Sequence, residues 1–135
     1  MRNRWWLKGI ALLAVTTWAA TPTPAQQVLD ERVLPREVAE EVLRVWNAPG
    51  TLRVDGPYTV EAAREVTSDL SVLGGELLVL GHVRGRIVAV NADVRLTSGA
   101  RVDGEILVGG GRVTGSDVAT VRGQIRVYRA RLDYA

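Results

Sequence analysis

A short pattern recurs at an almost fixed step, and it constrains the fold of this chain more than any other feature. The pattern V-x-G-x-I begins at Val83, at Val102 and at Val121, so each copy starts 19 residues after the one before. A looser copy begins at Val66, 17 residues before the first of these. Self-similarity at a fixed period is typical of proteins built from stacked, equivalent units.

Within each unit the apolar residues alternate with other residues, and β-branched side chains dominate. The four copies continue as LSVLGGEL, IVAVNADV, ILVGGGRV and IRVYRARL. This period of two is typical of strands, whereas an amphipathic helix repeats every three to four residues. The equivalent positions that we predict to face the core are Ile87, Val94, Ile106, Val113, Ile125 and Leu132.

A unit of about 19 residues with short strands cannot enclose a core by itself. If successive units stack at about 4.8 Å per layer, their inward side chains form one continuous core. The sequence therefore predicts an all-β fold, a single-stranded β-helix. A sandwich of antiparallel strands, the alternative, does not require a fixed step. The glycines that we predict to form corners and turns are Gly85, Gly99, Gly104 and Gly123.

The segment before the repeats has a different period. In LPREVAEEVLRVWN, residues 34–47, the side chains of Val38, Val42 and Trp46 fall on one face. This spacing predicts an amphipathic α-helix of about three turns. Because the first coil of a solenoid exposes unpaired backbone groups, we predict that this short helix caps the N-terminal end. Residues 51–65 then form a degenerate first coil.

Residues 1–25 have the composition of a secretory signal peptide. The basic stretch MRNRWWLK precedes the apolar GIALLAVTTWAA and then TPTPA. The apolar run is shorter than the roughly 20 residues that a membrane-spanning helix needs. We predict cleavage after Ala25, with an uncleaved anchor as the alternative, and export to the periplasm or outer envelope. Residues 26–50 then form an N-terminal segment with the helix, and residues 51–135 form the β-helix domain.

Removing this leader changes the charge of the chain. The 17 basic and 15 acidic residues give a net charge of +2. Without the three basic residues of MRNRWWLK the balance is 14 against 15, or −1. The high isoelectric point therefore does not indicate a nucleic-acid partner. Residues 30–76 carry ten acidic and five basic side chains, and residues 77–135 carry five and nine. This asymmetry is either ordinary surface variation or a sign of head-to-tail association.

These repeats resemble a known family. The pattern V-x-G-x-[IV]-x-V-x-x-x-x-V, with G-A-x-V-x-G before a new coil at residues 99–104, is similar to that of the polymer-forming cytoskeletal proteins called bactofilins. The likeness covers residues 66–132 and extends to the β-helical repeats of related exported bacterial proteins. It implies a right-handed β-helix that polymerises end to end without nucleotide. Most bactofilins are cytoplasmic or attached to a membrane, so an export signal departs from the family pattern.

No catalytic or cofactor motif is complete. Gly104 and Gly109 match part of a phosphate-binding loop, but Gly110 and Gly111 stand where that loop needs lysine and Ser or Thr. His82, the only histidine, has no acid at a spacing that predicts a pair, so we interpret it as a solvated turn residue rather than a general base. The acidic residues lack the pattern of a calcium-binding repeat. We predict no enzyme activity, cofactor, metal or nucleotide.

The predicted function is therefore structural. We expect a non-enzymatic assembly module of the bacterial cell envelope that associates with itself through the ends of the β-helix, or with an envelope protein near a membrane or the cell wall. The alternatives are a periplasmic adaptor, an N-terminal extension of a larger outer-membrane protein, and a solenoid acyltransferase or glycan-acting enzyme. Because residues 132–135 stop partway through a repeat, the last coil is either an edge that becomes paired or part of a longer protein.

Overall fold

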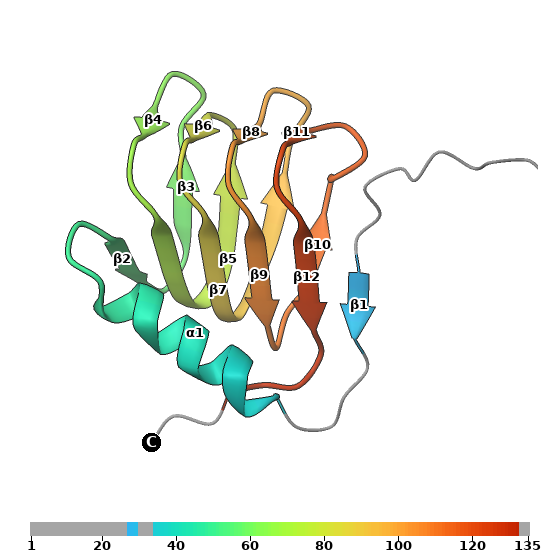
Figure 1. The fold of residues 1–135 in the computed structure, drawn as a ribbon. Helices are drawn as coiled ribbons and strands as arrows, with labels where there is room; N and C mark the ends of the chain where they lie inside the picture. Colours follow the sequence, from blue (N-terminus) through green and yellow to red (C-terminus); the bar gives the residue numbers. More distant parts are fainter. Residues whose placement is uncertain (1–26, 30–33, 133–135) are drawn as a thin grey trace, which may run out of the picture.

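The computed structural model describes residues 27–29 and 34–132, which form a β-solenoid with a helix along its flank (Figure 1). The predicted signal peptide, residues 1–25, lies outside the described residues. The elements in chain order are β1 (Gln27–Leu29), α1 (Arg36–Asn47), β2 (Leu52–Asp55), β3 (Tyr58–Val60), β4 (Glu65–Val66), β5 (Leu70–Val79), β6 (His82–Val83), β7 (Ile87–Leu96), β8 (Arg101–Val102), β9 (Ile106–Gly109), β10 (Val113–Thr114), β11 (Thr120–Val121) and β12 (Ile125–Tyr128).

Successive coils stack in the register that the repeat predicts. Leu52 pairs with Leu70, Leu70 with Ile87, Ile87 with Ile106, and Ile106 with Ile125, which gives steps of 18, 17, 19 and 19 residues. These pairings are all parallel, as a single-stranded β-helix requires. The described residues therefore make four complete coils, and β12 begins a fifth. The predicted β-helix with coils of about 19 residues is confirmed.

The strands form three columns along the solenoid. The first column contains β2, the first part of β5, the first part of β7, β9 and β12, and the second contains β3, the later parts of β5 and β7, and β10. The third column is a separate sheet of β4, β6, β8 and β11. The chain turns from the first column to the second through residues with positive φ, which are Gly74, Asn91 and Gly110 in successive coils. L-residues other than asparagine seldom adopt this backbone conformation.

The core lies inside the coils and follows the predicted positions with one exception. Ile87, Val94 and Ile106 are fully buried, and Val113 and Ile125 are nearly so. Leu132 was predicted to follow Val94 and Val113 in the core beneath the second column, and that prediction is wrong. The chain leaves the coil after β12, and Leu132 is only partly buried, against the helix. Its backbone N–H donates to Asn91 Oδ1 at 2.9 Å and its carbonyl accepts from Asn91 Nδ2 at 2.8 Å.

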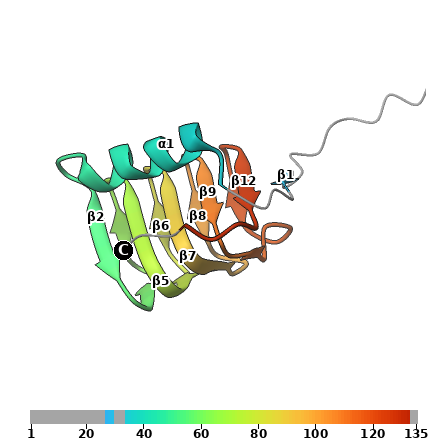
Figure 2. The same ribbon diagram turned by 90° about the horizontal axis from the view of Figure 1, so that it is seen from below.

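The helix forms where it was predicted, but it does not cap the first coil. It crosses the outer face of the first column, roughly perpendicular to the strands (Figure 2). Val38 and Val42 are buried there in a cluster with outward-facing residues of β7, β9 and β12, whereas Trp46 is only partly buried. Of the strands in this column, β7 and β9 are apolar on both faces, so their outer face needs a cover. The outward-facing apolar residues of the cluster are Val88, Val90, Leu107 and Tyr128.

The N-terminal strand lies at the opposite end of the solenoid from the coil that follows the helix. β1 pairs in parallel with β12, with Val28 opposite Val127. β1 therefore adds one strand to the first column beyond those that the successive coils supply, and it covers the outer edge of β12. Repeat analysis did not predict this strand, because residues 27–29 lie outside the repeats.

Candidate functional site

The corner glycines are structural, and their role is to let the coils approach closely. Gly85, Gly104 and Gly123 stack on one another at the corner between the third and first columns, and none has a positive φ. A Cβ built on Gly104 would lie 2.5 Å from the carbonyl oxygen of Gly85 and 2.7 Å from its carbonyl carbon. At Gly99 the nearest atom, the Leu80 carbonyl oxygen, would be 3.6 Å away, so this turn does not require glycine.

The glycines that resemble part of a phosphate-binding loop occupy two different corners. Gly104 belongs to the stack just described, and Gly109 ends β9. Gly110 and Gly111 form the turn that leads to β10. Strand β10 follows this turn, whereas a phosphate-binding loop leads into a helix whose N-terminus faces the phosphates. Residues 104–114 therefore do not have the shape of a phosphate-binding loop.

A polar network lies on the outer face of the third column. His82 Nε2 is 2.9 Å from Asp103 Oδ2, and the two side chains are about a quarter exposed. Arg101 Nε and Arg122 Nε lie 3.7 and 4.0 Å from Asp103 Oδ1. The expectation that His82 has no acidic partner is therefore wrong. His82 is paired with Arg101 in the next coil, and Asp103 lies two residues after Arg101 on the same face. The signal that could have found the pair is the stacking of V-x-G copies, which places Asp103 one coil above Arg84.

This network holds Asp103 in its ionised form. The hydrogen bond from His82 holds the pKa of the Asp103 carboxyl below its usual value, and the charges of His82, Arg122 and Arg101 act in the same direction against a smaller desolvation effect. A histidine–aspartate pair can orient a general base, but a nucleophile or a cleft beside it is also needed. The open cleft between β10 and β12 is lined by neither His82 nor Asp103. Among the described residues no three His, Asp or Glu side chains are placed to bind a metal ion.

The lowered pKa of Asp103 makes stability depend on pH. Because folding favours the ionised carboxyl, the stabilisation is fully present above the unfolded-state pKa of 3.8 and is lost as the pH falls through the lower folded-state pKa. We expect the wild-type chain to be more stable than Asp103→Asn at neutral pH, and the difference to shrink in acid. Urea unfolding of both proteins over a pH series measures it. A difference that stays constant from neutral to strongly acidic pH would contradict this assignment.

A second charged cluster joins the helix to the last strand. Arg126 Nη2 donates to Glu41 Oε1 at 2.9 Å and to Glu105 Oε1 at 2.7 Å. Arg86 Nη1 is 3.6 Å from the same Glu41 oxygen. Burial alone would lower the pKa of the Arg126 guanidinium, but the hydrogen bonds to Glu105 and Glu41 outweigh it and hold that pKa above its usual value. These contacts fix the helix against the fifth coil.

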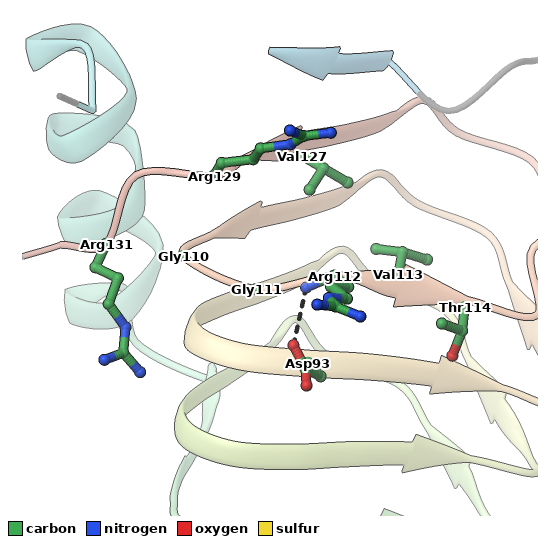
Figure 3. A pocket seen from close by; sticks show the side chains of 9 residues that line it. All are labelled: Asp93, Gly110, Gly111, Arg112, Val113, Thr114, Val127, Arg129 and Arg131. Carbon is green, nitrogen blue, oxygen red and sulfur yellow. Dashed lines mark hydrogen bonds between the residues drawn. The ribbon is translucent and has the colours of Figure 1, made fainter. Parts of the chain in front are cut away.

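A hollow lies at the C-terminal end of the solenoid, between β10 and β12, and we call it the C-terminal notch. It is an open cleft of about 800 Å³. It lies where the second strand of the fifth coil would be if the chain continued around the solenoid after β12. Figure 3 shows Val127 projecting from β12 into the space above β10. The residues that line it are Asp93, Gly110, Gly111, Arg112, Val113, Thr114, Val127, Arg129 and Arg131.

The other end of the solenoid is flush. The first coil consists of β2, β3 and β4, and within residues 27–29 and 34–132 each of these strands is the last of its column. The inward-facing Leu52, Val54 and Tyr58 of this coil are only partly buried. Their counterparts one coil later, Leu70 and Val72 among them, are completely buried. This end therefore exposes both apolar side chains and the outer edges of three strands.

Comparison of the chain with protein families, with curated proteins and with solved structures finds no match in any of the three. Among the described residues no helix is long and apolar enough to cross a membrane. The candidate functional regions are therefore judged from their geometry alone. They are the flush first coil, the C-terminal notch and the polar face of the third column.

Proposed function

We propose that this protein is a non-enzymatic assembly module of the bacterial cell envelope, and that it associates through the first coil of its β-helix. The observation that carries the proposal is the first coil, which no other described residue covers and which has partly exposed core residues and three strand edges without a described partner. Such edges are templates for pairing with another chain, and proteins that do not use them usually protect them. The likeness of the repeats to bactofilins supports association between copies.

Backbone direction indicates which groups the first coil offers. The N–H of Leu52 donates to the Asp69 carbonyl, and the N–H of Gly56 donates to the Leu73 carbonyl, so these groups point towards the second coil. Because hydrogen-bonding direction alternates along a strand, the N–H of Arg53 points to the free edge. A partner strand would accept a hydrogen bond from this group without disturbing the pairing of β2 with β5.

The charges of the two ends of the solenoid favour contact between the first coil of one copy and the C-terminal end of another. The charge difference between these ends is smaller than the sequence suggests, because part of the acidic charge lies on the helix. The helix that carries Glu37, Glu40 and Glu41 lies along the flank (Figure 2), and Glu41 accepts a hydrogen bond from Arg126 of the fifth coil. Residues 51–69 carry four acidic and two basic side chains, a balance of −2, and residues 112–132 carry one and five, a balance of +4. Attraction between oppositely charged ends is screened at high salt.

The test is sedimentation velocity of the purified protein over a range of concentrations, with Arg53→Pro and Arg53→Ala. Proline removes the outward N–H and is tolerated on an edge strand. Alanine keeps it, and both variants lose the bond of Arg53 to the Trp46 carbonyl. We expect the wild type and Arg53→Ala to form larger species as concentration rises, more so at low salt, and Arg53→Pro to remain monomeric with unchanged circular dichroism. A wild type that stays monomeric throughout would disprove self-association, and an associating Arg53→Pro would exclude β2 as the contact.

A further inference from the structure

The C-terminal notch exists because the chain abandons the coil path after β12. In the preceding coils the chain turns from the first column into the second, where it pairs with the strand below. Residues 129–132 instead cross the turns of the lower coils, and Leu132 is bonded to the side chain of Asn91. Among the described residues β10 consequently pairs with β7 and has no partner on its other edge.

The free edge of β10 offers main-chain groups to the notch. In the coil below, the N–H of Val94 donates upward to the carbonyl of Arg112 at 2.7 Å. Val113 pairs with Val94 in register, so it occupies the equivalent position one coil higher. Its N–H and carbonyl therefore point to the side where the next coil would lie. A strand placed there would find one donor and one acceptor at the usual spacing of a parallel sheet.

The lining of the notch defines the chemistry of such a strand. Val113 and Val127, which are 6% and 3% exposed, form the apolar floor of the notch. Arg112 and Arg131 lie on the rim. The one acidic lining residue, Asp93, accepts the backbone N–H of Arg112 on its Oδ1 at 3.0 Å. The notch thus combines a strand edge, an apolar floor and an excess of positive charge.

We propose that the C-terminal notch binds an extended acidic segment of a partner protein, which pairs with β10 as the missing second strand of the fifth coil. Strand addition to a free edge takes its affinity from main-chain hydrogen bonds and its specificity from alternate side chains. Apolar side chains of the segment face Val113 and Val127, and its carboxylates face Arg112 and Arg131. This site is separate from the first coil and does not depend on self-association.

In the end-to-end contact of two copies proposed above, the second copy would rest on β1 and would not fill the notch. A flush first coil stacked on the C-terminal end meets the first column, which already rises beyond β10 through β12 and β1. The second-column position would remain empty beneath the incoming β3. A single extended segment does not meet this obstacle, because it occupies one strand position only.

The test measures fluorescence anisotropy of a labelled peptide in which valine alternates with glutamate, titrated with the purified protein. Two matched peptides serve as controls: one has lysine in place of glutamate, and one has N-methyl groups that block main-chain pairing. The protein variants are Arg112→Glu with Arg131→Glu in one chain, and Arg44→Glu, a charge reversal at an exposed arginine of α1, as the control away from the notch. Unlabelled oligogalacturonate is included as an acidic glycan competitor.

We expect saturable binding of the acidic peptide and a loss of about tenfold or more in affinity for the lysine peptide and for the double arginine variant. N-methylation should abolish binding, and Arg44→Glu should leave it unchanged. Equal binding of the three peptides, or unchanged affinity of the double variant, would overturn the proposal. Binding of oligogalacturonate without binding of the acidic peptide would replace strand addition by glycan recognition. Sedimentation of the same samples shows whether the protein is monomeric, which keeps this result separate from that for the first coil.

Discussion

Replacing Gly104 with alanine is expected to lower the free energy of unfolding by about 3 kcal/mol. The new Cβ would lie 2.5 Å from the carbonyl oxygen of Gly85, in the middle of the corner stack. Backbone cannot move aside here as the end of a flexible side chain can, since both coils are held by the pairing of β7 with β9. Thermal unfolding followed by circular dichroism should show a midpoint lower by on the order of 15 °C.

The matched control is Gly99→Ala, in a turn of the same coil. Gly99 has no positive φ, and its new Cβ would meet the Leu80 carbonyl oxygen at an ordinary 3.6 Å. We expect a change between zero and a gain of about 1 kcal/mol, because alanine reduces the conformational freedom of the unfolded chain. If the two variants lose the same stability, close approach of the coils is not the reason for glycine at Gly104.

Most of the fold could be predicted from the repeat, because the pairing register of the strands and the buried positions both recur with the period of the repeat. Once V-x-G-x-I recurs at a fixed step, a parallel solenoid places each copy on the previous one, and the inward positions follow. Ile87 and Ile106 illustrate this, since they are aligned in sequence and paired in the structure. The prediction for Leu132 is wrong because the sequence alignment continues the repeat beyond the point where the chain leaves the coil. The hydrogen bonds of Leu132 with Asn91, which hold the chain there, cannot be predicted from a periodic pattern.

The position of the helix could have been predicted from the outward-facing residues of the repeats. Solenoid strands that face water on their outer side alternate apolar and polar residues, but IVAV and ILVG are apolar throughout. Val88 and Leu107 point outward and would be exposed without a cover. The cap was predicted from the unpaired backbone groups at the end of the solenoid. The apolar outer face of β7 and β9 is the surface that the helix covers instead.

The candidate sites were less predictable, because they depend on where separate coils and the N-terminal strand come together. His82 and Asp103 become neighbours only when the coils are stacked, and the C-terminal notch exists because residues 129–132 leave the coil path after β12. β1 has three paired residues and no repeat of its own. A segment this short has no periodicity that single-sequence reasoning can use.

Introducing a carboxylate into the buried face of the helix is expected to have an effect as large as that of Gly104→Ala. Val42 is 3% exposed within the cluster that joins α1 to the first column. In Val42→Asp the new carboxylate either stays buried without a partner, at a cost of about 4 kcal/mol, or the helix leaves the sheet. Guanidinium unfolding should show the loss of stability, and trypsin should cleave more rapidly at Arg36 and Arg44.

The neighbouring Leu43 supplies the control, because it lies on the same helix but is 52% exposed. Leu43→Asp should change stability by no more than about 0.5 kcal/mol. A double-mutant cycle of Glu41→Gln and Arg126→Gln then locates the helix. Arg126 belongs to β12 in the fifth coil, so the two substitutions should be coupled if α1 lies along the flank. Additive effects, or equal losses in Val42→Asp and Leu43→Asp, would contradict this position, since a helix over the first coil could not reach Arg126.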